Sequence, residues 1–183
     1  MRKLLSIPAA MATAGLLMFS SVQALAMSSA EHKAAQSAVE DTYRADKSAC
    51  DAMKNNAKDI CQAAAKGKEK VARAELDYKQ SGKPDDAKKL AMVKADASYE
   101  VAKEKCDDRK GNDKDVCVKE AKAAKVKAEA DAKAMKAEAD IKKDTLAEKR
   151  EADYKVAAEK CDSQSGDAKS SCMAAAKARF GKS

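Results

Sequence analysis

Large aromatic side chains are almost absent from this 183-residue chain, which has no Trp, two Phe and four Tyr. Alanine takes their place, and because each alanine buries little apolar area, the chain cannot fill a wide hydrophobic core. His32 is the only histidine. The sequence also shows no Ser-His-Asp set, no glycine-rich phosphate loop and no metal-spaced cluster. We therefore expect no enzymatic activity, no cofactor and no metal site, and we expect His32 to lie at the surface near the start of the mature chain.

Alanine and charge dominate what is present. Charged residues make up 37% of the chain, with 37 Lys and Arg against 30 Asp and Glu. This composition is typical of long helices. Only two prolines and six glycines interrupt it. The expected fold class is all-α, an elongated antiparallel helical bundle or rod.

The chain begins with the features of a signal peptide. Arg2 and Lys3 precede an apolar run, and Ala24–Ala26 form an A-x-A cleavage site. We expect removal of residues 1–26 and export of residues 27–183 to the periplasm. No later stretch is apolar enough to span a membrane. Outside the cytoplasm, disulfides persist.

A twelve-residue stretch with a cysteine at each end occurs three times and uses all six cysteines. In one continuous helix, the two cysteines would lie about 16 Å apart along the axis. A disulfide needs Cα atoms roughly 4.4–6.8 Å apart, so the chain must reverse between them. Zinc ligands and redox pairs usually stand closer, as in C-x₂₋₄-C and C-x-x-C. We therefore prefer structural disulfides to a metal or redox role, and we predict three helical hairpins, stapled by Cys50–Cys61, Cys106–Cys117 and Cys161–Cys172.

The centre of each stretch carries turn residues. Gly or Asn suits a left-handed residue that ends a helix, which predicts this role for Asn55, Gly111 and Gly166. The next position suits an N-cap, which predicts that role for Asn56, Asn112 and Asp167.

Between these turns, the apolar spacing and the breakers predict five helices. Gly82 followed by Pro84 ends the second helix. No glycine or proline stands between Asp113 and Ser165, which favours one continuous helix there. The expected ranges are about 30–54, 57–79, 85–106, 113–165 and 168–180.

The hairpins belong to a repeat, because the first cysteines of the three copies are 56 and then 55 residues apart. Periods near this length mark arrays of one supersecondary unit. The units cover about 30–84, 85–143 and 144–183. A tyrosine stands seven residues before each first cysteine, at Tyr43, Tyr99 and Tyr154. We favour a packing role for these tyrosines, with a ligand surface as the alternative.

A basic run follows each hairpin, and one lysine recurs five residues after each second cysteine, at Lys66, Lys122 and Lys177. These lysines are candidates for contact with an anionic polymer of the envelope. The alternative is an ordinary solvated face.

The segments YEVAKEKCDDRKGNDKDVC and YKVAAEKCDSQSGDAKSSC resemble a family of small exported proteins of β-proteobacteria. Its members are often labelled as cell-envelope biogenesis or TolA-like proteins, and the similarity covers essentially the whole mature chain. We expect this sequence to differ from TolA in having a cleavable signal and in lacking a C-terminal globular domain. The resemblance implies an exported helical protein, and TolA function is not transferred.

These observations lead us to expect a structural or interaction protein of the envelope without catalytic activity. The partner is an unknown envelope component, either a protein or an anionic polymer, and no nucleic acid is expected. One alternative is a periplasmic stress chaperone that holds unfolded clients. Another is a weak binder of anionic envelope polymers. We expect a monomer.

Overall fold

The computed structural model describes residues 27–182, so the predicted signal peptide lies outside the described residues. Five α-helices and no strand are found in this part of the chain. They are α1 (Ser29–Cys50), α2 (Asn55–Ser81), α3 (Pro84–Cys106), α4 (Gly111–Asp162) and α5 (Gly166–Phe180). The all-α prediction is confirmed.

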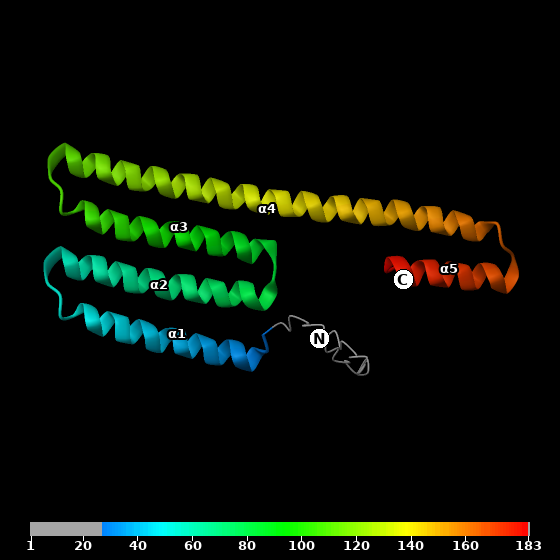
Figure 1. Cartoon of the computed structure of the whole chain (residues 1–183), viewed down its shortest axis with the longest axis horizontal. Coiled ribbons are helices and arrows are strands. Elements are labelled where there is room, and N and C mark those ends of the chain that lie inside the picture. The colour runs from blue at the N-terminus through cyan, green and yellow to red at the C-terminus, as the bar shows by residue number, and fades with distance from the viewer. Residues whose placement is uncertain (1–26, 183) are drawn as a thin grey trace, which may run out of the picture.

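The helices form one layer, not a closed bundle. Within the described residues each helix contacts only its neighbours along the chain, α1 with α2, α2 with α3, α3 with α4 and α4 with α5. Figure 1 shows α1, α2, α3 and the first part of α4 side by side, which we call the four-helix slab. Beyond the slab α4 continues alone, and α5 folds back along its far end to form the C-terminal hairpin. The molecule is therefore elongated.

The linkers between the hairpins explain this shape. Gly82 ends α2 in a left-handed conformation with φ 61°, and its N–H donates to the Tyr78 carbonyl at 2.8 Å. Pro84 then starts α3, where its fixed φ suits the first turn. The next linker has no such pair, so α4 runs unbroken for 52 residues, or about 78 Å. The predicted continuity is confirmed from Asp113 to Asp162, three residues short of the predicted end at Ser165, and the unit boundary near residue 143 falls inside this helix.

All three predicted disulfides are present. The bonded cysteines have Cα atoms 5.6, 5.7 and 5.6 Å apart in the first, second and third hairpin. No free cysteine remains in the described residues. Each bond joins the last turn of one helix to the second turn of the next, and the chain reverses between them as the spacing requires.

The predicted turn chemistry is partly wrong. Asn55, Gly111 and Gly166 do have positive φ, of 52°, 54° and 58°. However, each begins the following helix, and α1 ends at Cys50, four residues before its predicted end. The helix before each hairpin ends in a right-handed residue. An extended residue follows, and the left-handed residue comes only at the start of the next helix.

The predicted N-caps are also wrong. The N-cap positions are occupied by Lys54, Lys110 and Ser165, and none of their side chains makes a capping bond. Asn56 has a different role, because its Nδ2 donates to the Glu104 carbonyl at 2.8 Å. The Glu104 carbonyl also accepts from the Asp107 N–H at 3.1 Å, so the added bond from Asn56 ties the end of α3 to the start of α2.

The buried residues are few and small, as expected from the composition. They are Cys50, Ala65, Gly67, Ala74, Leu76, Ala95, Cys106, Ala132, Cys161 and Ala176. Helices pack closely because small side chains let them approach. A Cβ placed on Gly67 of α2 would lie 3.0 Å from the Cβ of Ala97 on α3. This core buries little apolar area, and the disulfides contribute part of the stability that a larger hydrophobic core would provide.

His32 does not have the surface position that we expected. Its side chain is only 14% exposed, and its Nε2 lies 3.6 Å from Asp77 Oδ1 on α2. Asp77 also receives a hydrogen bond from Lys89 of α3 at 3.0 Å. The amphipathic start of α1 is ordered against α2 by these contacts and by the Ser28–Glu31 capping box, which is why His32 does not lie in a frayed end.

Candidate functional site

A single layer of helices leaves two broad faces uncovered, and one of them has three parallel grooves. The groove between α1 and α2 has a volume of about 180 Å³, that between α2 and α3 about 820 Å³ and that between α3 and α4 about 720 Å³. Lys68 and Ala72 line both the first and the second groove, while Lys94, Ser98 and Ala102 line both the second and the third. The grooves therefore lie side by side on one face, which we call the grooved face.

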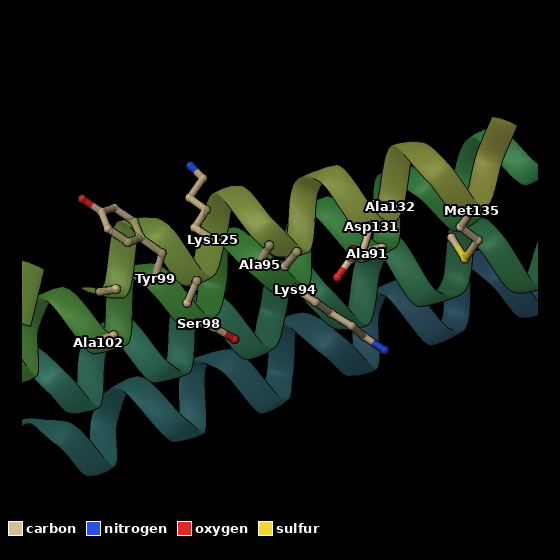
Figure 2. A pocket seen from close by; sticks show the side chains of 13 residues that line it. Ala91, Lys94, Ala95, Ser98, Tyr99, Ala102, Lys125, Asp131, Ala132 and Met135 are labelled. Carbon is tan, nitrogen blue, oxygen red and sulfur yellow. The ribbon is translucent and has the colours of Figure 1, made fainter. Parts of the chain in front are cut away.

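Alanines form much of the groove between α3 and α4. Ala95 and Ala132 are 6% and 3% exposed, so little side chain rises between the helices there. Figure 2 shows Tyr99 toward one end and Met135 at the other. The Lys94 and Lys125 side chains extend away from the ribbons. The result is an open apolar groove with charged rims, which can accept the ridge of side chains of another helix.

Lys125 is held beside this groove by two partners. Its Nζ lies 2.5 Å from Asp96 Oδ1 on α3 and 5.4 Å from the centre of the Tyr99 ring. The hydrogen bond to Asp96 raises the pKa of Lys125, and Glu129 acts in the same direction. The ammonium is therefore held in an ion pair that joins α4 to α3.

The tyrosine column is placed mainly by packing. Tyr43 lines the groove between α1 and α2, and Tyr99 lines that between α3 and α4. Tyr154 lies edge-on to Phe180, with ring centres 6.2 Å apart. All three rings are half-buried. A packing role agrees with this geometry, and in the slab the same rings also form part of the grooved face.

The other face of the layer is polar between α2 and α3. A groove of about 470 Å³ is lined there by Lys66 and Lys70 together with Asp59, Glu100 and Glu104. Because acids stand among the lysines, this surface is not a simple basic patch. Lys66 thus lies on a face of mixed charge.

The structure does not bring Lys66, Lys122 and Lys177 together in one chain. All three are exposed. Lys66 and Lys122 follow hairpin turns at the same end of the slab, whereas Lys177 follows the turn at the opposite end of the molecule (Figure 1). The reason is the straight α4, which reverses the direction of the third hairpin relative to the other two. Their contact with an anionic polymer stays a prediction.

Much of the basic excess is used to join helices. Lys68 binds Asp46 at 2.8 Å and Lys125 binds Asp96, while Arg73 bridges Glu40 of α1 and Glu69 of α2 at 2.8 and 2.9 Å. The hydrogen bond from Arg73 lowers the pKa of Glu40. Glu40 also pairs with Arg44 of its own helix at 3.6 Å. The pairs between helices could not be predicted, because the sequence does not show which helices are adjacent.

One repeated ion pair was also missed. In each hairpin the Asp after the first cysteine meets a lysine seven residues later, in the pairs Lys58–Asp51 at 3.0 Å, Lys114–Asp107 at 2.8 Å and Lys169–Asp162 at 2.9 Å. The recurrence of this spacing in all three copies was the available signal. The lysine offsets the unfavourable placement of an acid at a helix C-terminus.

Residues 27–182 contain no group of three or more His, Cys, Asp or Glu side chains arranged to hold a metal ion. Among the helices described, none is long and apolar enough to cross a membrane. Comparison of the chain with family models, curated proteins and solved structures found no match.

Proposed function

We propose that this chain is an exported, non-catalytic structural and interaction protein of the cell envelope that binds helical partners on its grooved face. The observation that carries the proposal is the open layer, in which three adjacent grooves lie uncovered on one face. The location in the envelope rests on the signal peptide and on the three disulfides, which suit an oxidising compartment.

The layer is suited to binding because covalent and ionic contacts join its helices and parallel grooves cross its surface. Disulfides close the hairpin turns, and ion pairs such as Lys94–Glu75 at 2.9 Å join α3 to α2. Because alanines line the bottom of the grooves, a partner helix can approach the backbone closely. Charged residues on the rims, among them Lys94, Lys125 and Asp131, provide directional contacts for a partner of matching charge.

Site-specific photo-crosslinking in the periplasm tests this proposal. A photoreactive residue in place of Ser98 lies on the ridge between the two larger grooves, and one in place of Lys103 lies on the same helix and faces elsewhere; both positions are exposed. We expect a discrete adduct from the Ser98 position, absent from the Lys103 position and absent when Met135, an exposed residue of the groove, is changed to Glu. Identical adducts from both positions, or none from either, would contradict a partner-binding grooved face.

The same grooves favour chaperone activity as a second candidate. Tyr99 and Met135 give the groove between α3 and α4 apolar side chains for an unfolded client. A client-aggregation assay separates the two functions. A chaperone should suppress aggregation of several unrelated clients near equal molar ratio, whereas a scaffold for one partner should suppress none.

A further inference from the structure

One face of α4 carries several exposed apolar side chains. Val116, Ile141 and Val156 are 43%, 67% and 56% exposed. At about 100° per residue, they fall on one stripe, within about 80° around the helix, together with four exposed alanines. The alanines are Ala123, Ala130, Ala134 and Ala152. This stripe points away from α3, and near its C-terminal end Ala152 also lines a groove shared with Lys182, which follows α5. We call it the outer stripe.

The repeat indicates what the outer stripe is for. Gly67 of α2 packs against Ala97 of α3 across the boundary between the first and second units, and Val101 lines the same groove. The residues 55 positions after Ala97 and Val101 are Ala152 and Val156, and the residue 56 positions after Gly67 is Ala123. Helix α4 therefore carries the equivalents of both sides of the α2–α3 interface. The equivalent of the α2 side lies toward one end of the outer stripe, and the equivalent of the α3 side lies toward the other end.

The free edge of α1 gives the contrast. Its residue equivalent to Ala97, 56 positions earlier, is Asp41, which is exposed and pairs with Arg44 at 3.5 Å. A polar residue is what a terminal edge of a repeat array needs. The outer stripe of α4 has alanine and valine at the corresponding positions, as an internal interface does.

The two halves on α4 cannot meet within one chain. Between the first two units, Ser81–Pro84 reverses the chain at Gly82. The equivalent segment of α4 is Ala137–Asp140, which contains neither glycine nor proline and stays helical. A continuous helix holds its two ends apart, so each half needs a partner from elsewhere.

In place of the monomer expected from the sequence, we propose that two copies of this protein pair antiparallel along α4, so that the second half of each α4 packs against the first half of the other. The α2–α3 register, with Gly67 opposite Ala97, carries over as Ala123 opposite Ala152 of the second copy. Repeated for both copies, this register puts a two-fold axis beside Ala137 and Glu138. Ile141 then lies opposite Ala134 of the second copy, close to the axis.

Two charge pairs along this register are complementary. Lys127 lies opposite Glu148 of the second copy, and Glu120 lies opposite Lys155 of the second copy; all four side chains are exposed in the single chain. Symmetry makes each pair occur twice. Near the axis, Glu138 of one copy lies close to Glu138 of the second copy, and the two negative charges repel. Glu138→Gln should therefore strengthen the dimer.

Pairing would restore the regular repeat. Each half of the assembly becomes a layer of six helices, because α4 and α5 of the second copy extend the slab at its α4 edge. The third hairpin turn of the second copy then lies at the same end as the first two turns of its neighbour. Lys66, Lys122 and Lys177 of the second copy come to one end of one layer. This assembly does not depend on the proposed function of the grooved face.

The first test is the oligomeric state of the exported protein, purified from the periplasm with its disulfides intact, by sedimentation over a concentration series. Ile141→Glu lies on the outer stripe, and Leu146→Glu is its matched control, five residues away and 53% exposed. We expect a dimer at micromolar concentration that Ile141→Glu weakens at least tenfold and Leu146→Glu leaves unchanged. A monomer at all concentrations, or equal effects of the two variants, would overturn the proposal.

Two further variants test the register and the cause. Lys127→Glu and Glu148→Lys should each weaken the dimer, and the double variant should restore it. A double variant that does not restore the dimer would contradict the register.

Replacing Ala137–Asp140 with Ser-Gly-Lys-Pro supplies the missing turn and should give a compact monomer of unchanged helix content. If the grafted protein stays dimeric and elongated, the missing turn is not the reason why the two ends of the outer stripe lack a partner within one chain.

Discussion

The four-helix slab and the C-terminal hairpin are built from the same repeat unit, yet they are held together very differently. In the slab α2 and α3 each have a neighbour on both sides, and seven of the nine buried side chains lie there. The C-terminal hairpin has one helix pair and buries only Cys161 and Ala176. Between the two regions, every residue of α4 from 141 to 150 is exposed. A stapled pair of helices becomes a well-buried structure only when another pair stacks against it.

The linker decides whether stacking occurs. A turn at Gly82 folds the second unit back onto the first, while the helix through Ala137–Asp140 carries the third unit away. The compact array thus has a turn where the extended one has a continuous helix. This difference gives four predictions, in order of expected effect.

Removing the third disulfide should release α5. Cys161→Ala with Cys172→Ala removes a staple worth about 3 kcal/mol in the chain-entropy model, from a hairpin with little other burial. Hydrogen exchange in α5 should then accelerate more than about a hundredfold, while α1 to α3 keep their protection. Removing Cys50 and Cys61 in the same way should leave α1 measurably protected, because α1 also packs along α2. Equal loss of protection in both variants would contradict the comparison.

Gly67→Leu should destabilise the slab and spare the C-terminal hairpin. Even a Cβ at this position would approach the Ala97 side chain to 3.0 Å, so a leucine must force α2 and α3 apart. Overpacking of this kind costs about 1–3 kcal/mol. Denaturant melting followed by exchange in α2 and in α5 measures the two regions separately. A variant as stable as the wild type would mean that the helix pair is loosely packed.

Phe180→Ala should loosen only the end of α5. The Tyr154–Phe180 contact has ring centres 6.2 Å apart and closes the open end of the C-terminal hairpin. Aromatic pairs contribute about 0.5–1.5 kcal/mol beyond their buried area, which corresponds to roughly tenfold faster opening. Exchange in the last two turns of α5 is the measurement, with Tyr78→Ala, at an exposed ring, as the control. Unchanged exchange after Phe180→Ala would show that the aromatic pair contributes nothing.

Acid should weaken the C-terminal hairpin slightly. The hydrogen bond from Lys182 lowers the pKa of Glu151 below its ordinary value of 4.5. A carboxyl group whose pKa is lower in the folded state stabilises the fold above its unfolded pKa, and this stabilisation is lost as the pH falls through the lowered pKa. Opening of α5 should therefore increase as the pH falls below 4.5. Glu151→Gln should remove that component, and a wild type with the same pH profile as the variant would contradict the role of this pair.

Spacing in the sequence was enough to predict the helices, the three disulfides and the continuity of α4, because these depend on residues close together in the chain. The single layer was not predicted. A helix packed on both sides needs small residues on two faces, and in an alanine-rich chain such as α2 almost every face offers them. Ala64, for example, has the spacing of a core residue yet is exposed, while Ala65 is buried.

The candidate site was predicted less well than the fold. The recurrence of Lys66, Lys122 and Lys177 suggested one surface, but the straight α4 sends Lys177 to the far end of the chain. The grooves could not be foreseen, since they depend on which helix faces are adjacent. The same is true of interhelical ion pairs such as Lys125–Asp96. Only the hairpin pair Lys58–Asp51 and its two repeats had a signal in the spacing itself.

The central claim is that α4 stays continuous across the exposed segment and keeps the two regions apart. A distance between spin labels on non-canonical residues at positions 116 and 156 tests it most directly, measured in a labelled fraction diluted with excess unlabelled protein so that only distances within one chain are seen. Forty residues of straight helix predict a single distance of about 60 Å. A broad distribution, or a main distance below about half that value, would mean that α4 bends and that the third unit folds back onto the slab.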